Sequence, residues 1–480
     1  MIQFIRSDFI IEKKMILPLV LLSVLISVLL INYLLIGISA VILTILLYMY
    51  GERLLIGIII VSLLTIVSDF GATIRLIVHL VNFVLLAFLF LKRYGFNFPE
   101  YPKIPRPIII FLSFYYFSMI ITAIFSQHFS AGVSMIVRQT IFFIIAYIFF
   151  SFIRDIKDVR TIIVSLIFVS MIIALSSIYE FSAGGFNLVN IALGIRYRIA
   201  NIVGNPLKAS TFFILTLPLV FTFIFSGKYK HKSTLLLSVS AILMIGLFLI
   251  ISRSAVFVIF LSVMFILAQL NKEWFKKFIF IMIITTLMFF LIEPLYKTIS
   301  LFFQIKFGLS QRDYFWAMAL HVIQDNPLLG IGPGSFRYEV FNYSPVLLDS
   351  WPGRVIIDLY MATEGENPSH NLFLKFASDM GIPGVITILY FMVQYFKIAA
   401  KTLRKAKDGF SEYFLIILAI SAAAGSMFVR GLFDSIGIVT YGIITSDLPF
   451  WLMFSILIFF YQKPKEYFTS DKAKGTDIIF

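Results

Sequence analysis

Residues 161–180 read TIIVSLIFVSMIIALSSIYE, and this stretch decides the fold class of the chain. Glu180 at its end is the only charged residue in it. A helix needs about 20 apolar residues to cross a hydrocarbon core roughly 30 Å thick, where the backbone must satisfy its own polar groups. The stretch therefore predicts a membrane-spanning helix. A turn at the membrane surface is expected before it, where Arg154, Lys157 and Arg160 lie.

The composition extends this prediction to the whole chain. Hydrophobic residues make up 60% of the sequence and charged residues 13%, and the mean hydropathy is +0.99, which excludes a water-soluble surface. The net charge is +14, but the basic residues lie in short turns, where membrane lipid rather than nucleic acid is the expected partner. The absence of cysteine excludes disulfides, thiolate metal sites and cysteine nucleophiles.

Similar apolar runs recur from Met15 to Tyr461 and predict an all-α polytopic membrane protein with about 12–14 transmembrane helices. The first run, 16–31, is followed at once by a second one without a small-residue cleavage pattern, so we expect a retained span rather than a secretory signal. The expected spans are 15–32, 34–50, 54–68, 73–91, 107–126, 133–152, 161–180, 207–226, 233–251, 254–271, 277–295, 372–396, 412–428 and 447–462.

The basic residues also predict the orientation of these spans. With the amino terminus in the cytoplasm, 26 of the 39 Lys and Arg residues fall on the inward side, and the reverse orientation would place most basic turns outside. An even number of spans then returns the carboxy terminus to the cytoplasm. We expect a single membrane domain over 1–480, with a large extracytoplasmic segment at 296–371 and a shorter extracytoplasmic loop at 181–206.

A separate set of charged residues falls on the outer side. Its members are Arg196, Arg198, Arg253, Arg312 and His370. The guanidinium fork of arginine suits bidentate binding of phosphate, so a lipid diphosphate in the outer leaflet would fit these arginines. The alternative is that single basic side chains near span ends reach toward lipid phosphate, and it is favoured for Lys208, Lys375 and Arg430.

His370 stands at the start of an expected span, in the sequence Asn367-Pro-Ser-His-Asn371. There it is placed to take a proton from an acceptor hydroxyl, although a lone histidine is more often structural. Asn371, Glu364 and Glu366 are candidates to orient it or to bind the acceptor. No His/Asp/Glu cluster has the spacing of metal ligands, so we predict neither a metal nor a cofactor.

The large outer segment contains one predicted helix and one predicted turn. Residues 311–323 have Tyr314, Phe315, Met318 and Val322 along one face, and Asp325-Asn-Pro327 would end this helix. The following Gly330-Ile-Gly-Pro-Gly334 lacks the Lys-Ser/Thr of a phosphate-binding loop, so we interpret it as a structural turn.

Three parts of the sequence resemble the bacterial O-antigen ligase and O-antigen polymerase superfamily. The first runs from Arg312-Asp-Tyr-Phe-Trp-Ala to Asn326-Pro-Leu-Leu-Gly-Ile-Gly-Pro-Gly-Ser-Phe336. The second is His370-Asn371, nine residues, and then Gly381-Ile-Pro-Gly-Val385. The third comprises Arg198-Ile-Ala-Asn-Ile-Val-Gly-Asn-Pro206 and Ser252-Arg-Ser254, where Ser254 replaces the Gly or Thr of many members. The likeness extends from about Arg196 to Tyr461.

The resemblance implies a membrane glycosyltransferase related to the GT-C architecture, in the bacterial cytoplasmic membrane. It would act outside that membrane on glycans linked to undecaprenyl diphosphate. It also implies that Arg196 or Arg198, together with Arg253 and Arg312, contacts the donor diphosphate, and that His370 activates the acceptor. The expected reaction is an inverting, metal-independent transfer.

The acceptor is either another lipid-linked repeat unit, as in a polymerase, or a sugar of the lipid A core, as in a ligase. The length of the chain and its outer segment narrowly favour the polymerase, for which a chain-length regulator is a further candidate partner. A protein O-oligosaccharyltransferase and a transporter or flippase of lipid-linked sugar are the alternatives. Aromatic residues of the outer segment could stack on sugars or anchor the chain at the membrane interface. They are Tyr314, Phe315, Trp316, Tyr343 and Trp351.

Overall fold

The computed structural model describes residues 51–65, 71–183, 202–302, 312–343, 369–407 and 412–469. The chain divides into two compact units, Met1–Ser62 and Leu63–Phe480. Helix α3 (Glu52–Thr65) supplies the described part of the first unit and continues into the second. All other described helices belong to the second unit.

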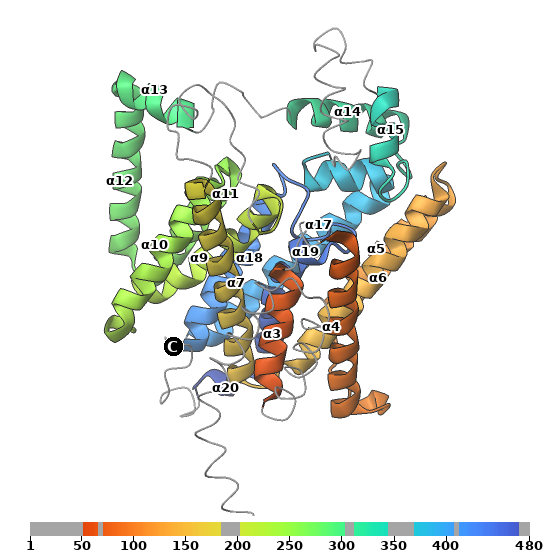
Figure 1. Ribbon diagram of the computed structural model, residues 1–480, viewed down its shortest axis with the longest axis horizontal. Coiled ribbons are helices and arrows are strands. Elements are labelled where there is room, and N and C mark those ends of the chain that lie inside the picture. The colour runs from red at the N-terminus through yellow and green to blue at the C-terminus, as the bar shows by residue number, and fades with distance from the viewer. Residues whose placement is uncertain are drawn as a thin grey trace, which may run out of the picture. The chain divides into compact units, whose positions relative to one another are not determined.

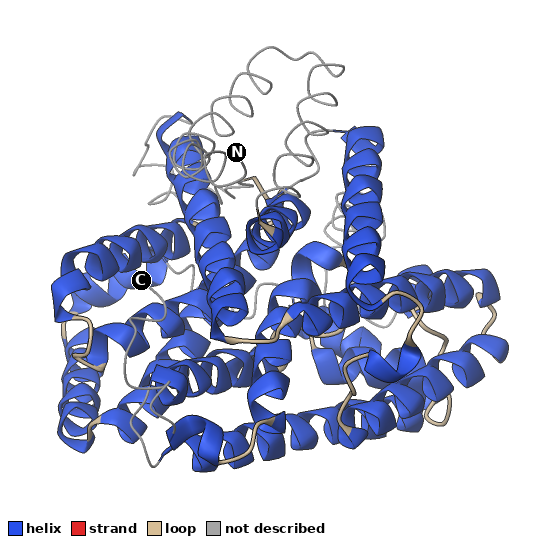
Figure 2. Cartoon of the chain, turned by 90° about the horizontal axis from the view of Figure 1, so that it is seen from below, coloured by secondary structure: helices blue, strands red, loops and turns tan. Residues whose placement is uncertain are grey.

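The described residues form helices joined by turns and contain no strand, which confirms the all-α prediction (Figure 2). The helices of the second unit are α4 (Gly71–Tyr94), η2 (Phe98–Glu100), α5 (Arg106–Ile124), α6 (Phe129–Phe152), α7 (Ile156–Ala183), α9 (Pro206–Phe225), η3 (Lys230–Lys232), α10 (Ser233–Leu249), α11 (Arg253–Leu270), α12 (Lys272–Leu291), α13 (Glu293–Phe302), α14 (Arg312–Asp325), α15 (Phe336–Tyr343), α17 (Leu372–Ala406), α18 (Glu412–Arg430), α19 (Ile444–Gln462) and α20 (Glu466–Thr469).

Within the described part of the chain, 10 helices are long and apolar enough to cross a membrane. They match the predicted spans from 73–91 onward, with the exception of 277–295. Helix α12, which covers most of that stretch, is not among the 10, and its first two turns contain Lys272, Glu273, Lys276 and Lys277. The predicted span 54–68 overlaps α3, which has 14 residues, and the last three residues of that span lie outside the described part of the chain. The predicted spans 15–32 and 34–50 lie outside the described residues. The protein is a multi-pass membrane protein.

The core of the second unit is built around α9, α18 and α19, whose side chains are almost all buried. Helix α9 packs against α7, α10, α11 and α18, and α17 packs against α5, α18 and α19. Small residues, Ser421-Ala-Ala-Ala-Gly425, let α18 approach its neighbours closely. Helices nearer the surface, such as α5 and α12, expose large apolar side chains, as a lipid-facing surface does.

Helix α17 changes direction at Gly381, where the backbone adopts φ 60° and ψ −147°. Residues 372–380 form a short first segment, and the membrane span follows after Pro383. Proline is favoured in the first turn of a helix because the amide hydrogen it lacks has no helical partner there. The predicted span 372–396 is therefore two helical segments that extend to Ala406.

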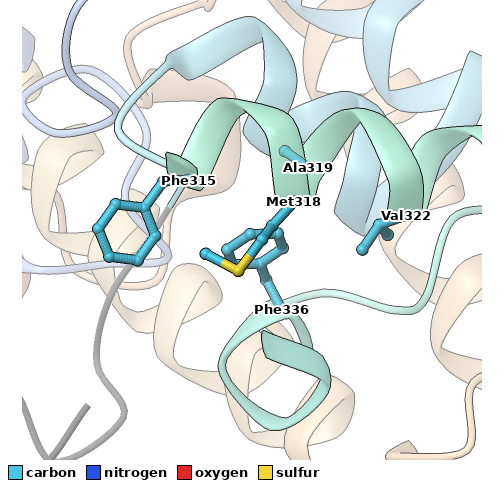
Figure 3. Packing of buried hydrophobic residues seen from close by; sticks show 5 residues of the cluster. All are labelled: Phe315, Met318, Ala319, Val322 and Phe336. Carbon is cyan, nitrogen blue, oxygen red and sulfur yellow. The ribbon is translucent and has the colours of Figure 1, made fainter. Parts of the chain in front are cut away.

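Helices α14 and α15 lie at one end of the bundle, above the first segment of α17 (Figure 1). Phe315, Met318 and Val322 of α14 are buried against Phe336 of α15 (Figure 3). This confirms the predicted helix and three of the four side chains on its inner face; the side chain of Tyr314 lies outside the description. Helix α14 ends before Pro327, as predicted. We refer to this end as the α14 end.

Candidate functional site

Several helix termini meet at the α14 end. The first residues of α17 are bound to the turn after α18, because Leu372 N donates to Gly431 O at 2.7 Å. The same turn reaches α11, where Phe433 and Phe257 stack edge to face at 6.3 Å. Helix α14 is attached to the start of α17 by Trp316 Nε1, which donates to His370 O at 3.3 Å. The starts of α11, α14 and α17 thus lie around one region of the bundle.

The start of α17 is closed by hydrogen bonds. Asn371 is its N-cap, and the side-chain oxygen accepts from Phe373 N at 2.9 Å and Leu374 N at 3.0 Å. Its amide nitrogen donates to Leu432 O at 2.9 Å. These bonds give Asn371 a structural role, and a part for it in acceptor binding remains a prediction.

His370 lies directly before this cap in a left-handed conformation, with φ 50°. Its ring contacts the buried ring of Phe315 edge to face at 5.2 Å and is itself half-buried. Phe315 therefore supports the imidazole from below and does not offer a free surface to a sugar. Left-handed backbone is uncommon for residues other than glycine and is held by the surrounding structure. The bonds of Asn371 and Trp316 provide that support.

Three arginines approach one another at the same end. The charge of Arg312, at the start of α14, repels both Arg253 at the start of α11 and Arg430 at the end of α18. No ion pair joins Arg312 to a carboxylate among the described residues. Positive charges that lie close together favour an anion between them. Because Arg430 is fully buried, Arg253 and Arg312 are the pair that can reach a ligand.

Arg430 is held by protein groups alone. Its guanidinium donates to Thr211 Oγ1 at 2.6 Å and Ser210 Oγ at 2.9 Å, and it forms an ion pair with Asp434 at 3.2 Å. These bonds fasten α18 to α9. The prediction that Arg430 reaches toward lipid phosphate is wrong, because no part of its side chain is exposed.

The glycine-rich turn after α14 docks onto the bend of α17. Ile331 N donates to Ser378 O, and Gly332 N donates to Asp379 O, both at 2.9 Å. A Cβ added to Gly330, where φ is 65°, would lie 2.5 Å from Ser378 O. A Cβ added to Gly381 would lie 2.4 Å from Leu328 O. The turn is therefore structural, as predicted, and it fixes α14 relative to α17.

A buried polar network joins the first segment of α17 to the turn before α19. Asp379 accepts from Tyr441 Oη at 2.6 Å and from Gly334 N at 3.3 Å. Lys375 donates to Val439 O at 3.2 Å and lies 4.0 Å from the centre of the Tyr441 ring. Burial and then the charge of Asp379 raise the pKa of Tyr441 well above its usual value, so this hydroxyl remains a donor. The predicted reach of Lys375 to lipid phosphate is wrong, because the side chain is buried and bonded within the bundle.

The turn between α5 and α6 also joins the α14 end. Ser126 Oγ donates to Ile331 O at 2.5 Å, and His128 Nε2 lies 2.8 Å from Glu339 Oε1. His128 also stacks on Tyr338 at 4.7 Å. These contacts give His128 a structural role.

Other predicted site residues lie outside the described residues: Arg196, Arg198, Glu364, Glu366 and Trp351. Among the described predicted residues, Arg253, Arg312 and His370 come from separate stretches of the sequence and meet at the α14 end. The part of the chain that the structure describes contains no group of three or more His, Asp or Glu residues that could hold a metal, and metal independence remains a prediction.

Sequence reasoning missed the polar network. Lys375 and Asp379 are four residues apart and therefore share one face of a helix. A pair of opposite charges inside an expected span is costly unless the two interact. That spacing could have identified the pair, whereas Tyr441 comes from a distant turn and offers no comparable signal.

One known protein family matches the part of the chain that contains these residues. Residues 237–389 match the family model described as O-antigen ligase. The matched range contains Arg253, Arg312, His370 and the glycine-rich turn, and it ends before the span predicted at 412–428. No curated protein matches the chain. Residues 237–389 are therefore similar to the O-antigen ligase and polymerase superfamily, whose members are glycosyltransferase-like membrane enzymes.

Proposed function

We propose that the protein transfers a glycan from undecaprenyl diphosphate to a hydroxyl acceptor at the α14 end. One observation carries the proposal: Arg253 and Arg312 converge near the start of the helix that His370 precedes. An anion-binding pair beside a candidate base is the arrangement that such a transfer requires. The family match supports the coarser part of the proposal, a glycosyltransferase-like reaction on lipid-linked glycans.

In the proposed reaction the acceptor hydroxyl gives its proton to His370. The acceptor oxygen forms a bond to the anomeric carbon of the glycan, on the face opposite the diphosphate. The bond between that carbon and the diphosphate oxygen breaks, and the electron pair leaves with undecaprenyl diphosphate. Arg253 and Arg312 stabilise the charge that develops on the leaving group, and attack from the opposite face inverts the anomeric centre.

The acceptor and the orientation belong to the same proposal. We favour a lipid-linked repeat unit as acceptor, and hence a polymerase, over the lipid A core of a ligase. The α14 end would face outward from the bacterial cytoplasmic membrane, with both termini in the cytoplasm. The excess of lysine and arginine in the opposite turns supports this orientation.

The test is an assay with purified protein and a defined undecaprenyl-diphosphate oligosaccharide, with and without lipid A core. Elongation without the core supports the polymerase, and transfer that requires the core supports the ligase. Transfer to added peptide would instead indicate a protein O-oligosaccharyltransferase. Movement of the lipid-linked glycan across a bilayer without any new glycosidic bond would establish the flippase alternative and reject the proposed reaction.

A further inference from the structure

The start of α11 differs from the described helix starts whose N-cap residue is asparagine. Its N-cap residue is Ser252, but the side chain of Ser252 makes no capping hydrogen bond. Helices α9 and α12 also begin after an N-cap residue, and there Asn205 and Asn271 accept from backbone amides of the first turn. The first helical bond of α11 runs from Val256 N to Ser252 O at 3.1 Å. The amides of the first turn are therefore left without the cap that a serine usually supplies.

The two serine hydroxyls at this start are buried without a partner. Ser252 and Ser254 are each 7% exposed, and neither hydroxyl oxygen has a hydrogen-bond partner among the described residues. The amides of Ser254 and Ala255 have no partner there either. Two buried hydroxyls and two backbone amides at one helix end are donors without an acceptor, and an unmet donor is costly to bury.

The backbone before Ser252 is also unusual. Ile251 has φ 49°, a left-handed conformation in which a β-branched side chain is strained. Such strain persists where the surrounding structure enforces it, and it is often associated with a ligand site. This turn fixes where Ser252 and the first amides of α11 lie.

The charges of the region favour an anion as the ligand of these donors. A helix start carries a partial positive charge, and Arg253 is its first residue. Arg312 adds a second full positive charge close by. Hydroxyl and amide donors surrounded by positive charge bind a tetrahedral oxyanion, and a phosphate accepts from several donors at once.

We propose that the first turn of α11 is a phosphate site in which the hydroxyls of Ser252 and Ser254 and the amides of Ser254 and Ala255 bind one phosphate of a lipid diphosphate. The site deepens the proposed function and rests on it for the identity of the lipid. The start of α17 does not share this role, because Asn371 and Gly431 already satisfy its first amides.

The test measures equilibrium binding of undecaprenyl diphosphate without a glycan to purified protein in phosphatidylcholine nanodiscs. We expect Ser252→Ala and Ser254→Ala each to weaken binding about tenfold, because each loses a hydrogen bond to a charged group. Ser421→Ala is the matched control, since the Ser421 hydroxyl is also buried without a partner but lies in the middle of α18. Its binding should equal that of the unmodified protein.

Ser252→Asp separates a ligand site from a merely structural serine. A carboxylate is a good N-cap, so this variant should unfold at the same temperature or higher, yet bind the diphosphate at least tenfold more weakly through repulsion. A structural role predicts no loss of binding in this variant. Unchanged binding in all three variants would overturn the phosphate site.

A second arm identifies the source of the phosphate. Nanodiscs that contain phosphatidylglycerol offer a membrane phosphate in place of the diphosphate, and they should compete only weakly. Equal competition would overturn the assignment to a diphosphate lipid. If the unmodified protein binds the diphosphate and the serine variants bind it equally well, the phosphate site fails but the proposed function stands. If the unmodified protein binds no diphosphate, the proposed function itself fails.

Discussion

The starts of α17 and α11 share a backbone conformation but differ in their capping hydrogen bonds. In each, a residue with φ near 50° precedes a polar N-cap residue: His370 before Asn371, and Ile251 before Ser252. Asn371 closes the start of α17 with hydrogen bonds to its first amides, whereas Ser252 leaves the start of α11 open. The closed start holds a candidate base in position, and the open one has donors for an anion. This difference agrees with the proposed roles, proton transfer at the start of α17 and phosphate binding at the start of α11.

The largest expected effect separates these two roles. His370→Asn should lower the transfer rate by about 10²- to 10⁴-fold, the usual contribution of a general base. Asparagine tolerates the left-handed backbone, so the thermal unfolding temperature should hardly change. Binding of undecaprenyl diphosphate should be unchanged as well. Transfer kinetics and binding measured on one preparation check this prediction. Full activity in His370→Asn would show that His370 is not the base.

Removal of a charge from the anion-binding pair should have the next largest effect. Arg312→Ala should lower kcat/KM by about 10²-fold, because it removes a donor to the charge that develops on the leaving group. Arg253→Lys keeps the charge but loses the planar fork, so part of this loss should remain. Arg337→Ala is the control, since Arg337 packs on Tyr338 in α15. Equal losses in Arg337→Ala and Arg312→Ala would show a general effect of charge instead.

The docking of the glycine-rich turn can be broken without touching either start. Gly330→Ala places a Cβ in contact with Ser378 O at a left-handed position and should lower the free energy of unfolding by about 3 kcal/mol. Gly95→Ala shares the left-handed backbone, at φ 56°, but meets nothing within 4 Å. It should cost only about 1 kcal/mol. Unfolding in detergent measures both, and equal costs would show that the close contact does not matter.

The smallest expected effect is the loss of an N-cap side chain, which can be compared between Asn371 and Ser252. Asn371→Ala should lower the free energy of unfolding by about 1 kcal/mol, because two amides of α17 lose their acceptor. Ser252→Ala should cost almost nothing, because Ser252 makes no capping bond. The same unfolding assay compares the variants, and a similar cost for both would remove the distinction between a closed and an open start.

The sequence predicted the helices because length and hydropathy alone decide a membrane span. The inner face of α14 was predicted because Phe315, Met318 and Val322 recur at helical spacing. The network of Lys375, Asp379 and Tyr441 was not predicted, since it depends on which helices are neighbours. The sequence also gave no sign that Ser252 fails to cap α11, because serine is a normal N-cap and only its hydrogen bonds show otherwise.

The central claim is that the α14 end transfers a glycan from a lipid diphosphate with His370 as base. Its most direct test follows purified protein with undecaprenyl-diphosphate oligosaccharide and measures both new glycosidic bonds and released undecaprenyl diphosphate. The account predicts one released lipid for each bond formed, and loss of both products in His370→Asn. Glycan transfer that continues in His370→Asn at the unmodified rate would contradict it.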